Sequence, residues 1–306
     1  MPNILTAILA SVLLALNVAV HGGLILLLAV FKFLLPFPFV RKPLDSLLNA
    51  IAQDWVRCNG LWMAALLSIE WRIEGVEQLD PHGWYLIASN HQSWVDIFVL
   101  QKTMHGHTPF LKFFIKQQLI FVPILGQACW ALDFPFMKRY SRAYLEKHPE
   151  KAGQDQATTR KSCARFSLVP TAVINFLEGT RYTPAKHARQ QSPYRHLLKP
   201  KAGGMALAMQ AMGEKFNALL DVTIFYPDGI PTMREFLGGR LHKVVVQVRK
   251  LPIPAAYTVD NPAPEVRTQV QDWLNALWQE KDQRLTNLAQ AADTRRADGT
   301  QAAAAE

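Results

Sequence analysis

The N-terminal segment constrains this chain most. From Ile4 to Val30 no side chain carries a charge, with His21 neutral. A helix that crosses a bilayer needs about 20 consecutive apolar residues, so this run is long enough to do so. No Lys or Arg precedes it and no A-x-A site follows a short apolar stretch, which is unlike a cleaved signal peptide. The sequence therefore predicts a membrane anchor.

The anchor can take two forms because His21-Gly22-Gly23 interrupts the apolar run. One form is a single long tilted span, and the other is a pair of helices that dip into one leaflet and return. We expect His21 to act as a polar cap at the break, with an intramembrane functional role as the alternative. Lys32, Arg41 and Lys42 follow the run, which favours a cytoplasmic location for the rest of the chain.

A second helix is predicted from Ser46 to Trp71, where apolar residues recur at spacings of three and four. Asp54 and Arg57 lie inside it and argue against a full span. Its tryptophans are typical of a helix at the bilayer interface. An amphipathic helix packed on a soluble domain explains the pattern equally well.

Composition limits the classes of partner. Of the 306 residues, 19% are charged, against roughly 25% in ordinary soluble domains, and the net charge is +9. Such a charge favours anionic lipid, phosphorylated substrates or nucleic acid. We expect no nucleic-acid partner, because Lys and Arg are spread along the chain and no nucleic-acid motif is present. Three scattered cysteines and the absence of zinc-like spacings predict neither a disulfide framework nor a metal site.

After Trp71, short apolar strands alternate with helical segments. This pattern predicts an α/β fold with a mostly parallel sheet flanked by helices. We divide the chain into an anchor and interfacial helix at 1–71, a catalytic domain at 72–292 and a disordered tail at 293–306. The expected strands begin near residues 71, 84, 172, 219 and 243, and the expected helices begin near residues 97, 202 and 264.

The most specific local pattern is Asn90-His91-Gln92-Ser93-Trp94-Val95-Asp96, which directly follows a predicted buried strand. On a strand-to-helix turn the Asp96 carboxylate can fold back onto the imidazole, fix its tautomer and stabilise the imidazolium. Such a dyad can take a proton from an alcohol. The alternative is a helix cap with a solvated aspartate.

A second pattern, Phe176-Leu177-Glu178-Gly179-Thr180-Arg181, also follows an apolar strand. A glycine at this point lets the backbone approach a ligand closely, and Arg181 can bind a phosphate through two parallel hydrogen bonds. Glu178 could orient a hydroxyl or position Arg181. A turn with a structural ion pair between Glu178 and Arg181 is the alternative.

Two further blocks complete the set. Between Lys112 and Arg139, basic residues mix with aromatic ones, which suits a site for a phosphate beside an apolar chain or simple docking on anionic lipid. The run from Val222 to Pro227 is a strand that ends in proline, and an ordinary core strand with a turn explains it equally well.

The four blocks together, in this order, resemble the glycerol-phosphate and lysophospholipid acyltransferase family over about residues 70–250. The 1-acylglycerol-3-phosphate and lysocardiolipin-type acyltransferases of the bacterial inner membrane are the most similar subgroup. Leu177 stands where the family most often has proline. Phe136-Met137-Lys138-Arg139 matches the second block loosely.

The resemblance implies an O-acyltransferase. His91 and Asp96 would be the general-base dyad, with Lys116, Asn90 and Ser93 as supporting residues, and the acceptor phosphate would be bound by Arg139, Glu178, Gly179, Thr180 and Arg181. No bound cofactor or metal is implied, and the acyl donor would be acyl-CoA or acyl carrier protein. The partners would be the bilayer and a lysophospholipid, most simply 1-acylglycerol-3-phosphate, on the cytoplasmic side of a bacterial inner membrane.

Two alternatives remain open at this stage. The chain could be a remodelling acyltransferase that acts on a lysophospholipid with another headgroup. It could also be a catalytically inactive, lipid-binding relative, although His91, Asp96, Glu178 and Arg181 are all present.

Overall fold

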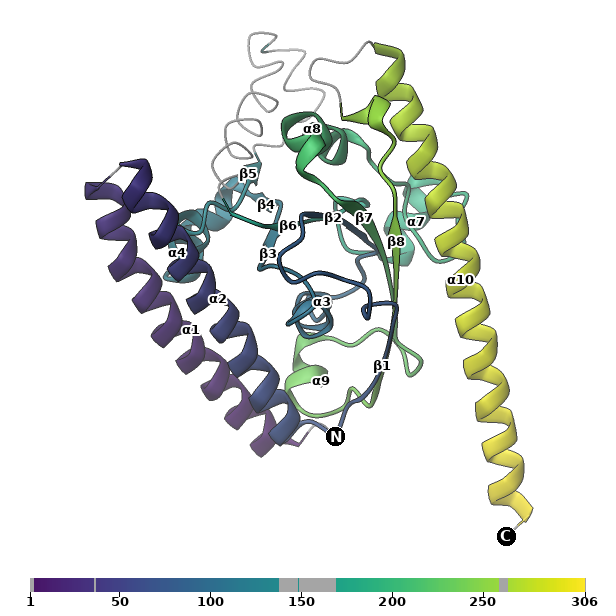
Figure 1. Cartoon of the computed structure of the whole chain (residues 1–306). Helices are drawn as coiled ribbons and strands as arrows, with labels where there is room; N and C mark the ends of the chain where they lie inside the picture. Colours follow the sequence, from purple (N-terminus) through teal and green to yellow (C-terminus); the bar gives the residue numbers. More distant parts are fainter. Residues whose placement is uncertain (1–2, 36, 138–147, 149–168, 259–263, 306) are drawn as a thin grey trace.

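The chain folds around a six-stranded mixed sheet with helices on both faces (Figure 1). The computed structural model describes residues 3–35, 37–137, 148, 169–258 and 264–305. The strand order is β1-β8-β7-β2-β6-β3, and every neighbouring pair is parallel except β7 and β8. The strands are β1 (Glu70–Glu74), β2 (Tyr85–Ser89), β3 (Leu111–Phe113), β6 (Ala172–Phe176), β7 (Ala218–Phe225) and β8 (Lys243–Leu251). The predicted mostly parallel α/β fold is confirmed.

Alternate residues of the central strand β2 face two separate apolar cores. Tyr85 and Ile87 belong to one core, and Leu86 and Ala88 belong to the other. The first core includes residues of α1 (Ile4–Leu34), α2 (Pro38–Leu66), α3 (Asp96–Met104) and α9 (Met233–Leu237). The second includes residues of α8 (Gly203–Met212) and α10 (Pro264–Ala305). The sheet is therefore buried on both faces, as parallel strands require.

The N-terminal helices differ from the expected pattern at two points. His21-Gly22-Gly23 lies inside the continuous helix α1, so the predicted break does not form. The His21 ring instead contacts the Asn17 carbonyl and, at 3.1 Å, the Asp54 carboxylate of α2. The second helix runs from Pro38 to Leu66 rather than from Ser46 to Trp71. The helix pair considered within the apolar run therefore does not form, and α1 packs instead against the separate helix α2.

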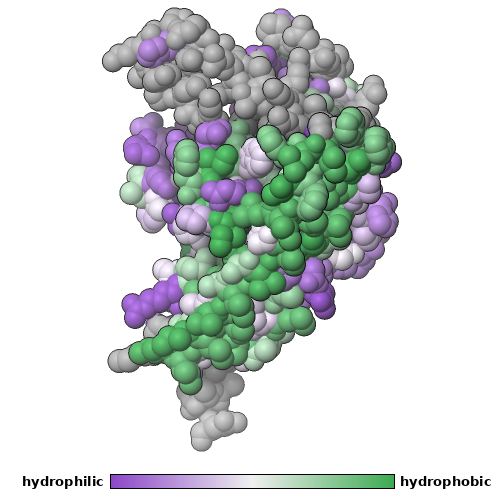
Figure 2. All heavy atoms as spheres, turned by 90° about the vertical axis from the view of Figure 1, so that its left-hand side faces the viewer, coloured by the Kyte–Doolittle hydropathy of each residue, from purple (hydrophilic) through white to green (hydrophobic). Residues whose placement is uncertain are grey.

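Both ends of α1 contact the domain that carries the sheet. The Asn3 amide donates to the Gly238 carbonyl at 3.2 Å, and the Lys32 ammonium donates to the Ala131 carbonyl at 2.8 Å. The helix lies along the domain, and its outer face forms an apolar band (Figure 2). Among the described residues, α1 is the one helix long and apolar enough to cross a bilayer.

The long helix α10 covers the opposite side of the sheet from α1 (Figure 1). It continues to Ala305, whereas the sequence predicted a helix that ends at Ala292 and a disordered tail. The alanines and arginines of this segment are good helix formers, which explains the continuation.

Short elements join the larger ones. They are β4 (Ile115–Lys116), η1 (Gln117–Phe121), α4 (Leu125–Ala131), β5 (Phe136–Met137), α7 (Pro184–Gln190), η3 (Gly213–Lys215) and η4 (Ala255–Tyr257). Strands β4 and β5 pair with each other in a separate two-stranded sheet.

Candidate active site

The candidate site is built where three adjacent strands end. His91 follows β2, Glu178 follows β6 and Tyr226 follows β7, and β2 lies between the other two. The carboxyl ends of neighbouring parallel strands meet at one edge of a sheet, which is the usual position for a ligand in open α/β folds. The fold therefore brings together residues from three of the four blocks.

His91 and Asp96 form the predicted dyad. The His91 Nδ1 lies 2.8 Å from the Asp96 Oδ2, an arrangement in which Nδ1–H donates to the carboxylate. The same oxygen accepts from the backbone amides of Gln92 and Ser93, at 2.6 and 2.9 Å. The Tyr226 hydroxyl donates to the other oxygen, Oδ1, at 2.6 Å. This geometry leaves the His91 Nε2 as the nitrogen available to a substrate.

Asp96 is completely buried, whereas 12% of the His91 side chain is exposed. The imidazole stacks on the Phe176 ring, with the ring centroids 3.9 Å apart. Burial of Tyr226 beside Asp96 raises the pKa of the Tyr226 hydroxyl well above its ordinary value, so the hydroxyl keeps its proton and donates. The carboxylate is held from all sides while the imidazole retains an open edge.

The two supporting residues Asn90 and Ser93 shape the turn that carries the dyad. The Asn90 side chain donates to the Ile224 carbonyl at 2.9 Å and accepts from the Ile224 amide at 2.8 Å. The Ser93 hydroxyl donates to the Pro231 carbonyl at 2.5 Å and accepts from the Val95 amide. Both side chains are buried, so they fix the backbone rather than face a substrate.

One interpretation of the sequence was an ion pair between Glu178 and Arg181, but the contacts of Glu178 lie elsewhere. Glu178 is fully buried, and its two oxygens accept from the backbone amides of His91 and Leu198, at 2.8 and 2.9 Å. Burial raises the pKa of Glu178 to about 8 despite these hydrogen bonds. The described contacts make Glu178 a link between the β6 end and the His91 backbone.

Arg181 lies close to the dyad turn. Its guanidinium stacks 4.8 Å from the centre of the Trp94 ring, and the Tyr182 amide donates to the His91 carbonyl at 2.7 Å. Lys186 of α7 donates to the Thr180 hydroxyl at 2.8 Å and to the Arg181 carbonyl at 2.9 Å. Gly179 has a φ of +67°, which a residue with a side chain rarely adopts. A turn that carries the exposed Arg181 and the half-buried Lys186 therefore borders the dyad.

Two predicted residues remain, and the structure describes one of them. Arg139 lies outside the described residues. Lys116 is exposed on β4, and no described contact joins it to His91 or Arg181. The sequence analysis assigned no role to Tyr226, Trp94 or Lys186. Tyr226 lies in the fourth block and Trp94 in the first, whereas Lys186 lies outside the four blocks.

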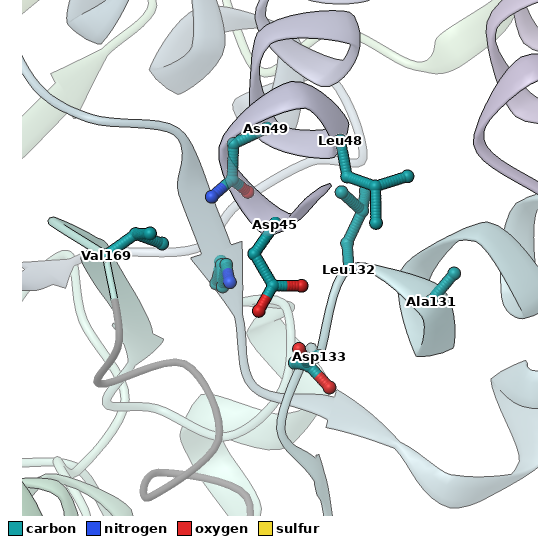
Figure 3. A pocket seen from close by; sticks show the side chains of 8 residues that line it. Asp45, Leu48, Asn49, Ala131, Leu132, Asp133 and Val169 are labelled. Carbon is teal, nitrogen blue, oxygen red and sulfur yellow. The ribbon is translucent and has the colours of Figure 1, made fainter. Parts of the chain in front are cut away.

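A separate pocket lies between α2, β3 and the segment that follows α4 (Figure 3). Its lining includes Asp45, Lys112 and Asp133, and it has room for about one water molecule at roughly 10 Å³. Lys32 pairs with Asp45 at 2.8 Å and with Asp133 at 2.5 Å. Burial lowers the pKa of Lys112 to about 8. This charged cluster joins α1 to α2 and to the segment after α4. His91 and Asp96 do not line the pocket.

The described part of the chain offers one possible metal-ligand group. His21, Asp54 and Cys58 place their ligand atoms within 4.8 Å of one another. The Asp54 carboxylate already accepts from Arg57 at 2.7 Å and contacts His21 at 3.1 Å. The contact between His21 and Asp54 makes this group a polar link between α1 and α2.

The curated proteins that are similar in sequence to this chain include several 1-acyl-sn-glycerol-3-phosphate acyltransferases. The 1-acyl-sn-glycerol-3-phosphate acyltransferase gamma of Mus musculus is 28% identical over 182 residues, which are 56% of this chain and 44% of that protein. The delta protein of Mus musculus is 27% identical over 182 residues, with 56% and 43% covered. The gamma protein of Homo sapiens is 27% identical over 211 residues, with 64% and 51% covered. The chain spans about half the length of these curated relatives.

The fold has a solved counterpart. The crystal structure of the 1-acyl-sn-glycerophosphate (LPA) acyltransferase, PlsC, from Thermotoga maritima aligns with a TM-score of 0.51 and 17% identity, covering 93% of this chain and 96% of that chain. The family model named Acyltransferase matches residues 70–227, just over half of the chain and all of the strand ends described above. The chain therefore belongs to the acyltransferase family.

Proposed function

We propose that this protein transfers a fatty acyl chain from an acyl thioester to the free hydroxyl of a lysophospholipid, most simply 1-acylglycerol-3-phosphate. The observation that carries the proposal is the 2.8 Å contact of the His91 Nδ1 with a buried Asp96, which leaves Nε2 as the free base. The names of the relatives supply the acceptor class.

In the proposed mechanism the Nε2 of His91 takes the proton from the acceptor hydroxyl. The oxygen attacks the thioester carbonyl, an ester bond forms, and the C–S bond breaks as the tetrahedral intermediate collapses. The proton on Nε2 then passes to the thiolate that leaves. Asp96 stabilises the imidazolium between these steps. The scheme requires no bound cofactor, and the donor is acyl-CoA or acyl carrier protein.

Arg181, together with the turn of Gly179 and Thr180, is proposed to bind the phosphate of the acceptor. Its guanidinium borders the dyad turn through Trp94 and can form two parallel hydrogen bonds to a phosphate. Arg139 is proposed as a second cation. Glu178 is assigned a positioning role, because its carboxyl group holds the His91 backbone and is shielded from solvent.

The anchor is proposed to place this site at a membrane surface. Both ends of α1 contact the domain, so α1 and α2 fit a two-helix motif that lies in one leaflet of the bilayer. A site at the interface avoids lifting a lipid into water, at a cost of roughly 0.8 kcal/mol per CH₂. We propose the cytoplasmic face of a bacterial inner membrane as the location.

The test is release of free thiol from oleoyl-CoA by vesicle-bound protein, with and without lysophosphatidic acid, for wild type and His91→Ala. Release that depends on the acceptor and disappears in the variant is the expected result. Equal release by both proteins would overturn the dyad assignment. No acceptor-dependent release with acyl-CoA or acyl carrier protein donors and several lysophospholipids would favour the inactive, lipid-binding alternative.

A further inference from the structure

The segment Gln117–Trp130, which contains η1 and most of α4, carries an exposed apolar surface that the dyad chemistry does not use. Phe121 is 80% exposed, and Trp130 is 47% exposed. Val122, Ile124 and Leu125 are also exposed between them. The sequence from Gln117 to Leu132 contains no charged side chain. A contiguous apolar surface of this kind marks an interaction site.

This surface is continuous with the outer face of α1. A Cβ atom on Gly22 would lie 2.4 Å from the Cγ2 atom of Ile124, so the side chain of Ile124 packs where α1 has no side chain. At the other end of α4, Lys32 donates to the Ala131 carbonyl. One contact within the segment and one directly after it thus hold the segment along the second half of α1. Hydrophobic residues form a band over this side of the molecule (Figure 2).

The backbone of Ile124 is held in an unusual conformation to achieve this packing. Its φ is +63°, which is rare for a β-branched residue. Nearby backbone groups are paired within the segment: the Gly126 amide donates to the Val122 carbonyl, and the Gln127 side chain donates to the Ile120 carbonyl. Internal pairing lowers the cost of moving this backbone from water towards lipid.

We infer that Gln117–Trp130 is a second membrane-contacting element, which enters the same leaflet as α1 at the boundary between headgroups and acyl chains. The occupant of the surface is the phospholipid bilayer. Continuity with α1 favours lipid over a protein partner, and the exposed Lys116 at the edge of the segment suits anionic headgroups. The inference rests on the membrane attachment under the proposed function.

The element also has a structural connection to the candidate active site. The chain enters it from β3 and β4, and β3 pairs with β6. Phe113 of β3 stacks with Phe176 of β6, and Phe176 stacks with His91, at centroid distances of 6.1 and 3.9 Å. A bilayer contact here would therefore position the dyad relative to its lipid substrates.

The test places an environment-sensitive fluorophore at single cysteines in vesicle-bound protein, after the three native cysteines are replaced and acyl transfer is verified. The positions are Phe121→Cys in the segment, Val12→Cys on α1 and Gln290→Cys on α10, all of which are exposed. Quenching by a doxyl lipid is compared with quenching by aqueous iodide. The expected result is lipid quenching at positions 12 and 121, and iodide quenching at position 290.

The outcomes separate this inference from the proposed function. Lipid quenching at 12 with iodide quenching at 121 would overturn the inference and leave the anchor in place. Iodide quenching at 12 would overturn the membrane attachment itself. A matched pair of variants adds a second measurement: Phe121→Glu should lower binding to phosphatidylcholine/phosphatidylglycerol vesicles at least tenfold, whereas Gln290→Glu should leave it unchanged. Equal binding of the two variants would contradict the inference.

Discussion

Asp96 and Asp221 are both fully buried carboxylates beside the same sheet, but their partners are of opposite kinds. Asp221 on β7 contacts three cations, Lys281 at 2.6 Å, Arg249 at 2.7 Å and Arg284 at 3.2 Å. Asp96 instead meets two backbone amides, a tyrosine hydroxyl and one imidazole.

The difference in partners indicates that the charge of Asp221 stabilises the fold, whereas the charge of Asp96 can serve the proposed reaction. Burial alone would raise the pKa of Asp221, but Lys281 and Arg249 hold this pKa below its ordinary value, so the carboxylate stays ionised and these cations balance its charge. This cluster joins α10 to the sheet. Neutral donors hold Asp96 in place without cancelling its charge, which leaves that charge for an imidazolium on His91. Substitutions at the two sites should therefore affect different properties.

The largest expected effect follows from Asp96→Asn. An amide of the same shape can retain some backbone contacts but loses the negative charge, so we expect the turnover rate to fall about a thousandfold or more. Thermal melting followed by circular dichroism checks that the variant folds. A folded Asp96→Asn protein with nearly normal turnover would remove the dyad from the mechanism.

Lys281→Met tests the structural side of the comparison. Lys281 is fully buried and pairs with Asp221, so its removal should lower the free energy of unfolding by about 3 kcal/mol. Chemical denaturation measures this loss. The rate per folded molecule should stay within about threefold of wild type, and a much larger loss of rate in fully folded protein would contradict the division between the two carboxylates.

Glu178→Gln sharpens the comparison through pH. The pKa of Glu178 is raised to about 8, against 4.5 for the free side chain. Between these values the folded protein retains a proton on Glu178 that the unfolded chain releases, so the contribution of Glu178 to stability is fully present below about pH 4.5 and is lost as pH rises to about 8. The variant cannot titrate and should remove up to about 1 kcal/mol per pH unit of this slope. Melting curves from pH 5 to 8 measure it; identical slopes would mean that Glu178 is ionised throughout.

Tyr226→Phe should have the smallest effect. Asp96 keeps its amide partners and His91 but loses the hydrogen bond from the Tyr226 hydroxyl. We expect the turnover rate to fall about tenfold as a result. With one donor fewer, the carboxylate attracts protons more strongly, so the acid limb of the pH–rate profile should move to higher pH. A purely structural role would lower stability and leave the shape of that profile unchanged.

The sequence predicted the elements whose patterns are local. Strand β6 was expected to begin near residue 172, where it does begin. The spacing of His91 and Asp96 allowed either a dyad or a helix cap, the family resemblance favoured the dyad, and the two side chains are in contact. Three short strands were not predicted, because two or three residues carry no measurable alternation. Tyr226 was not assigned a role, since it is 130 residues from Asp96 in the chain. The break at His21-Gly22-Gly23 was wrong because tertiary partners, Asp54 and Ile124, hold that part of α1 in a helix.

The most direct test is the rate at which labelled acyl groups pass from oleoyl-CoA to lysophosphatidic acid, measured by mass spectrometry at low temperature. The rate per folded molecule is compared for wild type and the two single variants, Asp96→Asn and Lys281→Met. We predict that Asp96→Asn forms about a thousandfold less product than wild type, and that Lys281→Met remains within about threefold. Equal loss in the two folded variants, or product formation by Asp96→Asn at the wild-type rate, would contradict the assignment of acyl transfer to the dyad.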